Sequence, residues 1–169
     1  MAAQGKKIAV LANILRREGQ QIAKDVAVEF TIPQFVRGEF SNAGTDETPL
    51  FIFDGVMEAK ITGKGVDGRM VDIASPYSAR YKLSEVQQAN NVEGDAELDQ
   101  VQIVFKGKGA GLPGHGSTVG EGYEPEYTII LSRYEQYLNG EELVLIDRDL
   151  NICRIHGKDY FQEINDKLN

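Results

Sequence analysis

Residues 127–147, YTIILSRYEQYLNGEELVLID, constrain the fold of this chain more than any other segment. Apolar and polar residues alternate on both sides of Asn139-Gly140, and this period of two is typical of a half-buried strand. An Asn-Gly pair suits a type I′ turn, because that turn requires positive φ at both central residues. Gly140 would interrupt a helix, and the β-branched and aromatic residues around it favour a pleated surface. The segment therefore predicts one long β-hairpin.

Further strands are predicted from the same alternation. Residues 8–15 can form a first strand, and residues 24–32 and 101–106 each separate an apolar face from a polar one. Residues 51–62 can form a strand that bends at Asp54-Gly55, and its second half separates the same two kinds of face. Residues 35–40 can form an extended edge after Pro33, which stops regular pairing. The expected apolar faces comprise Val26, Val28, Phe30, Ile32, Met57, Ala59, Ile61, Val101, Ile103 and Phe105. The chain is therefore expected to be mainly β.

Two regions predict short helices. Residues 69–74 favour a helical turn, and residues 159–168 favour a C-terminal helix in which Asp159 and Gln162 form a capping box. Residues 75–89 are ambiguous. Ser75-Pro76 is a good helix start and local propensity favours a helix, yet Ala79, Tyr81 and Leu83 alternate with polar residues as in a strand.

The composition fits a single domain. The chain has 169 residues, 41% of them hydrophobic, and no apolar run approaches the roughly 20 residues that a membrane-spanning helix needs. Asn13 and the charged residues 16–18 interrupt the N-terminal apolar stretch, which argues against a signal peptide. A lone cysteine, Cys153, cannot form an internal disulfide. The net charge of −8 argues against tight, nonspecific binding of nucleic acid, which needs clustered Lys and Arg.

Chemical motifs are weak in this sequence. Residues 109–114 match G-x-G-x-x-G, but Pro113 and the glycines after it prevent the helix start that would bind a pyrophosphate. Cys153, His156 and His115 lack the second close pair of ligands that a structural zinc site needs. The sequence contains no G-x-S-x-G, P-loop or H-E-x-x-H motif. It therefore predicts no catalytic residues, no cofactor and no metal site.

From Tyr137 to its end, the chain contains a turn ending in Gly, then Glu-Leu, Ile-Asp, Asn before an apolar residue, and Gly-x-Asp before a final helix. This series resembles the C-terminal signature of the major tail tube protein of contractile-tailed bacteriophages (myoviruses) and R-type tailocins. The segment FTIPQF and the Glu-aromatic segment running into a Gly-containing loop resemble the family's N-terminal half. The residues that carry the resemblance are Pro33, Gly44, Tyr137, Gly140, Glu142, Leu143, Asp147, Asn151, Gly157 and Asp159.

The resemblance implies a fold and an assembly. The expected protomer is a small antiparallel β-barrel or sandwich with one or two short flanking helices, forming hexameric rings with a continuous inner β-barrel. It implies one tail-tube domain over residues 1–169, with an N-terminal arm at about residues 1–20 and a C-terminal helix at about residues 159–168. It also makes residues 69–74 a helix and residues 79–86 a strand, against local propensity.

The same resemblance implies a structural role in the virion. Stacked rings would form the inner tube of a contractile tail, assembled in the host bacterial cytoplasm, through which DNA is ejected into the host cell. The implied partners are other copies of the chain, the tail sheath, baseplate or tube-initiator proteins, tail-terminator proteins, and a tape-measure protein in the lumen during assembly. DNA would cross the lumen without specific binding, and no membrane segment is expected.

Strands that line such a lumen should be apolar toward the core and polar toward the channel. The candidate lumen residues are Glu29, Thr31, Glu58, Lys60, Gln102, Lys106, Glu126 and Thr128. Loops at residues 38–50 and 107–122 are long for hairpin connections, so they are candidates for contacts between rings or subunits. The candidate contact residues in these loops are Glu39, Phe40, Asn42, Thr45, Asp46, Glu47, Leu112 and His115.

Two alternatives remain open at this point. The tube protein of a type VI secretion system, or of a related contractile injection system, would share the expected fold and assembly. A monomeric β-sandwich that binds a ligand belongs to a different functional class and would present an aromatic-lined cleft. The absence of Trp and the scattered tyrosines count against the monomeric sandwich.

Overall fold

The computed structural model describes residues 8–39, 47–90 and 93–169, excluding the side chains of Ile8, Glu39 and Glu47. The strands and helices follow one another along the chain as β1 (Ile8–Arg17), β2 (Gln20–Lys24), β3 (Ala27–Thr31), β4 (Gln34–Glu39), β5 (Glu47–Asp54), β6 (Glu58–Thr62), the 3-10 helix η1 (Val71–Ala74), β7 (Ala79–Asn90), β8 (Ala96–Gly109), β9 (Glu126–Leu138), β10 (Glu141–Asp147), β11 (Ile152–Ile155), β12 (Lys158–Asp159) and α1 (Gln162–Leu168).

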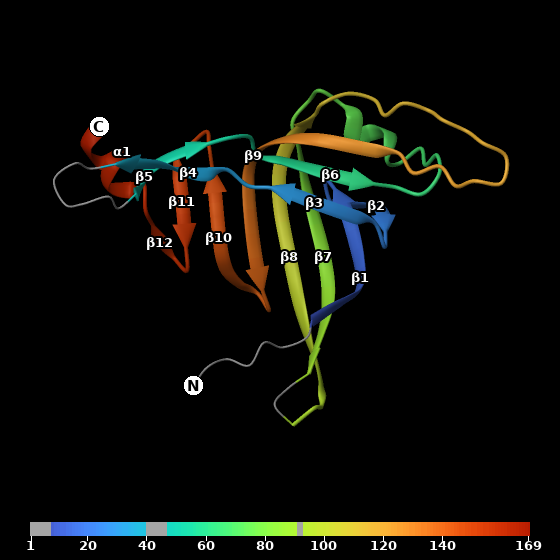
Figure 1. Ribbon diagram of the computed structural model, residues 1–169, viewed down its shortest axis with the longest axis horizontal. Helices are drawn as coiled ribbons and strands as arrows, with labels where there is room; N and C mark the ends of the chain where they lie inside the picture. Colours follow the sequence, from blue (N-terminus) through green and yellow to red (C-terminus); the bar gives the residue numbers. More distant parts are fainter. Residues whose placement is uncertain (1–7, 40–46, 91–92) are drawn as a thin grey trace.

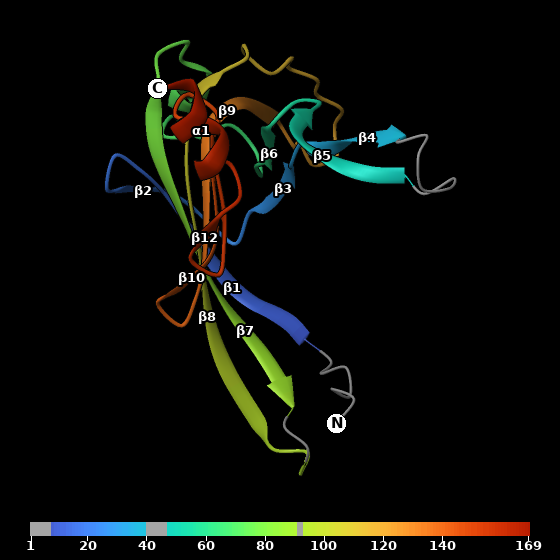
Figure 2. The ribbon, with the colours of Figure 1, turned by 90° about the vertical axis from the view of Figure 1, so that its left-hand side faces the viewer.

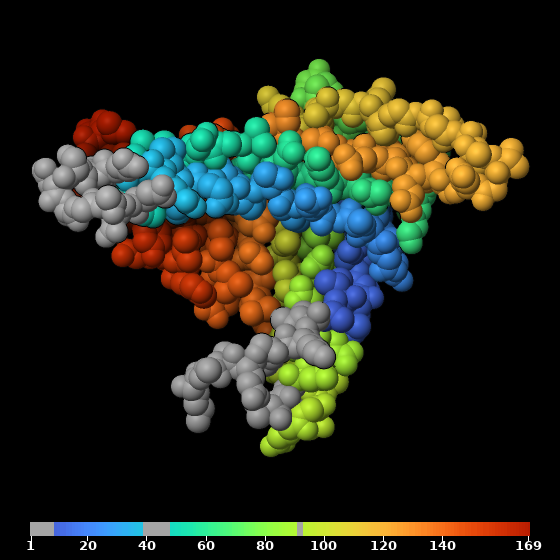
Figure 3. All heavy atoms as spheres, in the orientation of Figure 1, coloured from blue at the N-terminus to red at the C-terminus, as the bar shows by residue number. Residues whose placement is uncertain are grey.

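One ten-stranded antiparallel sheet forms most of the molecule. Its strand order is β12-β11-β10-β9-β8-β7-β1-β2, and β3 and β6 extend it from the first half of β9. Strand β9 lies along the top of Figure 1 and then turns downward beside β8, so that β3 and β6 lie across β7 and β8 (Figures 1 and 3). The sheets of the described residues do not close into a barrel, so this part of the expected barrel-or-sandwich fold is not seen in the protomer.

A β-bulge lies where β9 changes direction. Strand β8 pairs with β9 from Val101 to Gly109, and the register shifts between Lys106 and Gly107, which face Arg133 and Leu131. Before the shift β9 also pairs with β6, and after it β9 pairs with β10. A bulge bends and twists a strand locally, and this one lets a continuous sheet fold over its own apolar side.

The core fills the space between the two layers. Phe30 of β3 contacts Phe105 of β8 and Tyr134 of β9, with ring centroids 5.1 and 5.3 Å apart. Tyr81 of β7 stacks on Phe105 at 5.1 Å. These aromatic contacts join both layers within a single hydrophobic cluster. The predicted inward faces of residues 57–61 and 101–105 are confirmed, because the apolar residues at those positions are buried.

A separate two-stranded ribbon, β4–β5, lies at one end of the molecule beside α1 (Figures 1 and 2). Phe35 and Phe53 stack across the ribbon at 5.1 Å, and Phe161 contacts both rings. Phe161 is 2% exposed and immediately precedes α1. Apolar packing through Phe161 therefore positions the seven-residue helix, which is too short to be stable by itself.

The predicted hairpin is confirmed. Asn139 and Gly140 have φ of 48° and 85°, as a type I′ turn requires, and they join β9 to β10. Strand β7 confirms the strand implied by the family resemblance at residues 79–86, so the local preference for a helix there is wrong. Ala79, Tyr81 and Leu83 are buried between neighbouring strands, and this burial overrides helix propensity. The helical turn predicted at residues 69–74 corresponds to η1.

Several predicted boundaries are wrong. Residues 51–62 belong to two strands, β5 and β6, because β5 pairs with β4 in the ribbon while β6 pairs with β3 and β9. The break between them follows Asp54, where a bend within one strand is predicted. Pairing also extends β5 back to Glu47, so the first expected loop is shorter, and extends β8 on to Gly109, so the second connection is shifted to residues 110–125. Strand β1 occupies half of the expected N-terminal arm.

The predicted capping box is also wrong. Asp159 pairs in β12, and its carboxylate accepts hydrogen bonds from the backbone N–H groups of Phe161 and Cys153 at 2.9 and 3.2 Å. Helix α1 begins at Gln162 without a side-chain cap. Asp159 therefore stabilises the turn that precedes the helix.

Gly107→Ala should destabilise the protein by about 1–3 kcal/mol, because a Cβ at Gly107 would overlap the backbone carbonyl of Ile130 at the bend. Urea unfolding followed by circular dichroism measures this difference. Gly116→Ala is the matched control, because a Cβ there has no atom within 4 Å. Equal unfolding midpoints for the two variants would contradict the close-packing explanation of the bend.

Candidate functional site

The folded sheet has two outer polar surfaces with the apolar core between them. We call the outer side of β3, β6 and the first half of β9 the β6 face. We call the outer side of β1, β7, β8 and the second half of β9 the β8 face. Because side chains alternate across each strand, residues adjacent to the core-facing positions belong to one of these two faces.

The β6 face brings together six of the candidate lumen residues. Glu29 of β3 pairs with Lys60 of β6, which pairs with Thr128 of β9. Thr31 pairs with Glu58 in the next row, and Glu126 lies opposite Thr62 at the start of β9. The residues of this set are Glu29, Thr31, Glu58, Lys60, Glu126 and Thr128. The set is acidic overall, with one cation opposite a carboxylate.

The other two candidates, Gln102 and Lys106, lie on the β8 face. Gln102 pairs with Ser84 and Tyr137, while Lys106 pairs with Arg80 and Arg133. Between them Ile103 and Phe105 point into the core. The apolar core therefore separates Gln102 and Lys106 from the six residues of the β6 face.

An ionic network on the β8 face joins the hairpin to its neighbours. Arg133 donates hydrogen bonds to Glu135 and, at 3.0 Å, to Asp147 of β10. Tyr137 donates to the other oxygen of Glu135 at 2.7 Å. Glu135 and Asp147 are 5% and 6% exposed, so the guanidinium of Arg133 compensates two nearly buried carboxylates. Removing the cation would leave those charges uncompensated, which is costly in a buried site.

This network shifts the pKa of a tyrosine. The hydrogen bond to Glu135, together with burial, raises the pKa of Tyr137 to about 12, because an ionised phenol beside that carboxylate would be repelled. Tyr137 and Asp147 are among the family-motif residues, whereas sequence analysis missed Arg133 and Glu135. Positions 133, 135 and 137 alternate along one strand, and this spacing could have placed them on a common face.

Other motif residues form turns in the meander from β9 to α1. Gly140 and Gly157 have positive φ, as does Asn151 at 52°. The side chain of Asn151 donates to Asn165 of α1 at 2.9 Å, and Asn165 donates back to the Asn151 carbonyl at 3.0 Å. Glu142 accepts a hydrogen bond from Arg154 at 3.3 Å. The motif thus specifies how the C-terminal strands turn and attach to the helix.

Two further motif residues are Pro33 and Leu143. Pro33 is buried between β3 and β4. The backbone carbonyl of Leu143 accepts a hydrogen bond from the N–H of His156 at 2.9 Å. Gly44 lies outside the described residues, as do the contact candidates Phe40, Asn42, Thr45 and Asp46. Glu39 and Glu47 pair through their backbones at the end of the β4–β5 ribbon.

The second contact loop projects from the opposite end of the molecule to the ribbon (Figure 1). In this loop Leu112 is 76% exposed, and His115 packs on Tyr123 with ring centroids 4.8 Å apart. Of the other two metal-capable residues, Cys153 is buried and His156 is exposed at the β11–β12 turn. The described residues contain no group of three or more His, Cys, Asp or Glu that could hold a metal ion.

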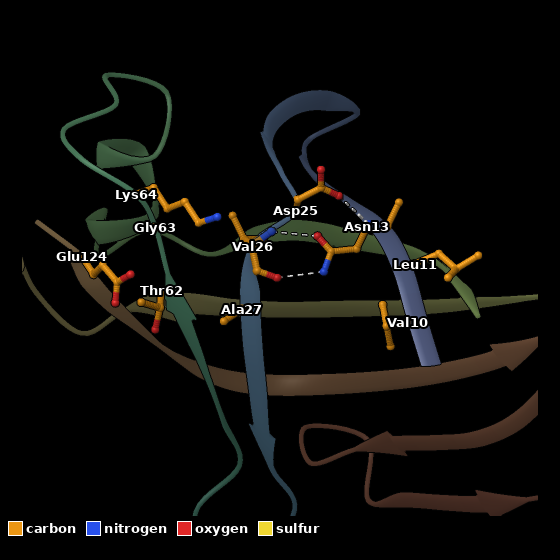
Figure 4. Close-up of a pocket in the computed structure, with 11 residues that line it drawn as sticks. Val10, Leu11, Asn13, Asp25, Val26, Ala27, Thr62, Gly63, Lys64 and Glu124 are labelled. Atoms are coloured by element: carbon orange, nitrogen blue, oxygen red, sulfur yellow. Dashed lines mark hydrogen bonds between the residues drawn. The ribbon is translucent and has the colours of Figure 1, made fainter. Parts of the chain in front are cut away.

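A groove of about 400 Å³ separates the first half of β1 from the start of β3 (Figure 4). Strand β2 pairs with β1 only from Ile14 onward, which leaves the edge of β1 open before that point. The Asn13 amide accepts a hydrogen bond from Val26 N–H at 2.9 Å and donates to the Val26 carbonyl at 2.8 Å. One side chain therefore replaces a pair of ladder bonds where the two strands separate, a role that the sequence pattern did not indicate.

Comparison with protein families decides the classification. The family model for phage tail tube protein FII matches residues 15–168, which is nearly the entire chain. The chain belongs to this family. No curated protein matches the chain. The match spans the core strands of both layers as well as the C-terminal motif.

Membership in the phage tail tube protein FII family defines the role in general terms. The protein is a structural component of the phage tail, and the family implies self-association into a tube and association with other tail components. A structural family of this kind suggests a protein without enzymatic activity. No helix among the described residues is long and apolar enough to cross a membrane.

Alkaline pH should destabilise the protein between pH 10 and about 12. An unfolded tyrosine titrates near pH 10, so the unfolded chain releases the Tyr137 proton first. Stability from this group is fully present below pH 10 and is lost as the pH rises through about 12. Urea unfolding at several pH values in this window measures the slope.

Tyr137→Phe should make that slope shallower, because it removes one titrating group. A residual slope should remain, because burial raises the pKa of Tyr134 to about 12. Tyr77→Phe, at a position that is 80% exposed, is the matched control. A slope for Tyr137→Phe equal to that of the parent would show that the bond to Glu135 does not persist in solution.

Proposed function

We propose that this protein is the inner-tube subunit of a contractile phage tail, in which hexameric rings stack into a conduit for DNA ejection. Family membership carries the proposal, since it already implies a tube. The open edges of the protomer support it. A sheet with unpaired edges exposes N–H and C=O groups that another chain can pair with, and closure around a ring removes those edges.

Open edges occur in both layers of the fold. Within the described residues β3 pairs only with β6, and β1 lacks a partner on one side before Ile14. The two edges face the same groove in Figure 4, where the Asn13 side chain bridges β1 to Val26 just before β3. An edge-to-edge contact between different surfaces of two copies is heterologous, and such contacts form rings when the rotation closes.

We assign the β6 face to the lumen. Among the six residues three carboxylates stand against one lysine, and Lys108 of β8 lies opposite Ile130 in the row of Glu58. The face therefore keeps a net negative charge, which repels the phosphate backbone and limits DNA retention. The β8 face carries Arg80, Lys106 and Arg133 and would hold DNA. This assignment retains Glu29, Thr31, Glu58, Lys60, Glu126 and Thr128 as lumen residues and removes Gln102 and Lys106.

The proposal extends to the rest of the tail. The tube would be assembled in the host bacterial cytoplasm from a baseplate or tube initiator, around a tape-measure protein, and would end at a terminator protein inside a contractile sheath. The β4–β5 ribbon and the loop with Leu112 and His115 project from opposite ends of the protomer, which supports roles in contacts between subunits (Figure 3).

The purified protein, alone or with its tube initiator, should form hollow tubes or six-fold rings. Negative-stain electron microscopy and light scattering test this. A particle that remains monomeric at high concentration and in the presence of the initiator would refute the tube proposal.

The combined change Glu29→Lys, Glu58→Lys and Glu126→Lys should make assembled tubes retain DNA. Each substitution replaces a negative charge that faces the proposed lumen with a positive one, and contacts with phosphates dominate the affinity of proteins for DNA. Co-sedimentation of tubes with short duplex DNA at low salt measures retention. Glu121→Lys with Glu163→Lys provides exposed control positions away from the β6 face. Equal DNA retention by both sets would refute the lumen assignment.

A further inference from the structure

The β7–β8 hairpin has opposite charges at its two ends. Its base, next to β9, carries Arg80, Lys82 and Lys106 on the β8 face. From residue 83 to residue 105 the chain contains no Lys or Arg. The acidic residues in that interval are Glu85, Glu93, Asp95, Glu97 and Asp99. The hairpin of an acidic protein is thus basic at one end and acidic at the other.

The basic end is a row of cations across neighbouring strands. Arg80, Lys106 and Arg133 lie directly opposite one another on β7, β8 and β9, and Arg16 of β1 lies opposite Lys82. Like charges in directly opposed positions destabilise a sheet. Arg133 is compensated by Glu135 and Asp147. No ion pair of Arg80, Lys82 or Lys106 occurs within the described part of the chain.

The surface at this row is hollowed. A depression of about 320 Å³ is lined by Glu18, Arg80, Lys106, Arg133 and Glu135, together with Ser78, Ala79, Val104 and Phe105. We call this depression the basic hollow. Arg80 and Lys106 repel each other across the sheet and have no ion-pair partner in the described part of the chain. An acidic partner outside the protomer would offset that cost.

The acidic end projects away from the body of the protein. Figure 2 shows β7 and β8 extending well beyond the other strands toward the turn that joins them. Ala89, opposite Glu97, lies nine positions after Arg80, opposite Lys106, along β7. At about 3.3 Å per residue the two ends lie roughly 30 Å apart, so the acidic end cannot reach the basic hollow of its own copy.

We propose that the acidic end of the β7–β8 hairpin of one copy docks in the basic hollow of the next copy along the tube axis. Two different surfaces meet in this contact, so it is heterologous and repeats by translation, as stacking of rings requires. The inference rests on the proposed tube and specifies the polarity of stacking. Duplex DNA is the competing occupant of the basic hollow, and the experiment below separates it from a second copy.

Paired charge reversals test the contact in the full-length protein. One variant carries Lys106→Glu in the basic hollow and Lys82→Glu beside it, opposite Val104 of its lining. A second carries Asp95→Lys and Glu97→Lys in the hairpin, and a third combines all of these changes. Lys158→Glu with Lys167→Glu is a control for the loss of positive charge at exposed positions. Circular dichroism and thermal melting first establish that every variant folds like the parent.

The measured quantity is the protein concentration at which half of the chains sediment as tubes. Each paired reversal should raise it at least about tenfold, and the combined variant should return it to within about threefold of the parent, because opposite charges meet again. Raising the salt from about 0.05 to about 0.5 M should weaken parental assembly, since these charges are exposed and screened.

Several results would overturn the docking contact. Assembly of both paired reversals at the parental concentration would show that neither surface takes part. If the combined variant does not return to the parental assembly concentration, the two surfaces do not meet. If, in addition, only the Lys82→Glu, Lys106→Glu variant loses co-sedimentation with duplex DNA, the basic hollow binds DNA instead. These results presuppose tubes of the parent protein, whereas failure of the parent itself to assemble would count against the proposed tube.

Discussion

The close approach of Gly107 to the carbonyl of Ile130 is the constraint on which the rest of the structure depends. Without a side chain at this position, β8 and β9 can shift register and turn together. The turn carries β6 and β3 over the apolar side of β7 and β8, where Phe30 meets Phe105. The fold can therefore bury the inner side of both layers of one continuous sheet and leave each layer with an outer polar surface.

The family motif in the C-terminal third is informative because its residues have demanding local tasks. Gly140, Asn151 and Gly157 adopt positive φ in successive turns, a conformation that most residues reach only at a cost. Asp147 both binds Arg133 and accepts the N–H of Leu150, which fixes the turn after β10. Such positions tolerate few residue types, so a resemblance in spacing carries structural information even where the strands between them vary.

Much of the fold could be predicted from local patterns, and the failures have a common cause. The alternation at residues 57–61 and the Asn139-Gly140 turn are local features, and both predictions are confirmed. Residues 75–89 were ambiguous because the partners of β7 are distant in sequence: β1 lies about seventy residues before it. The local sequence at Asp54-Gly55 indicates a bend in residues 51–62, but it does not reveal that β5 and β6 pair in different sheets.

The candidate site was harder to predict, because alternation identifies an outward side chain without saying which outer surface carries it. Gln102 and Glu58 have equivalent patterns, yet the core separates them. Charge distinguishes the two faces where periodicity cannot. A net charge of −8 conceals a basic row on β7, β8 and β9, and opposed cations of that kind weaken the isolated sheet. Residues that disfavour the protomer in isolation are the ones whose charge a neighbouring molecule can compensate, so the β8 face is better explained by assembly than by folding.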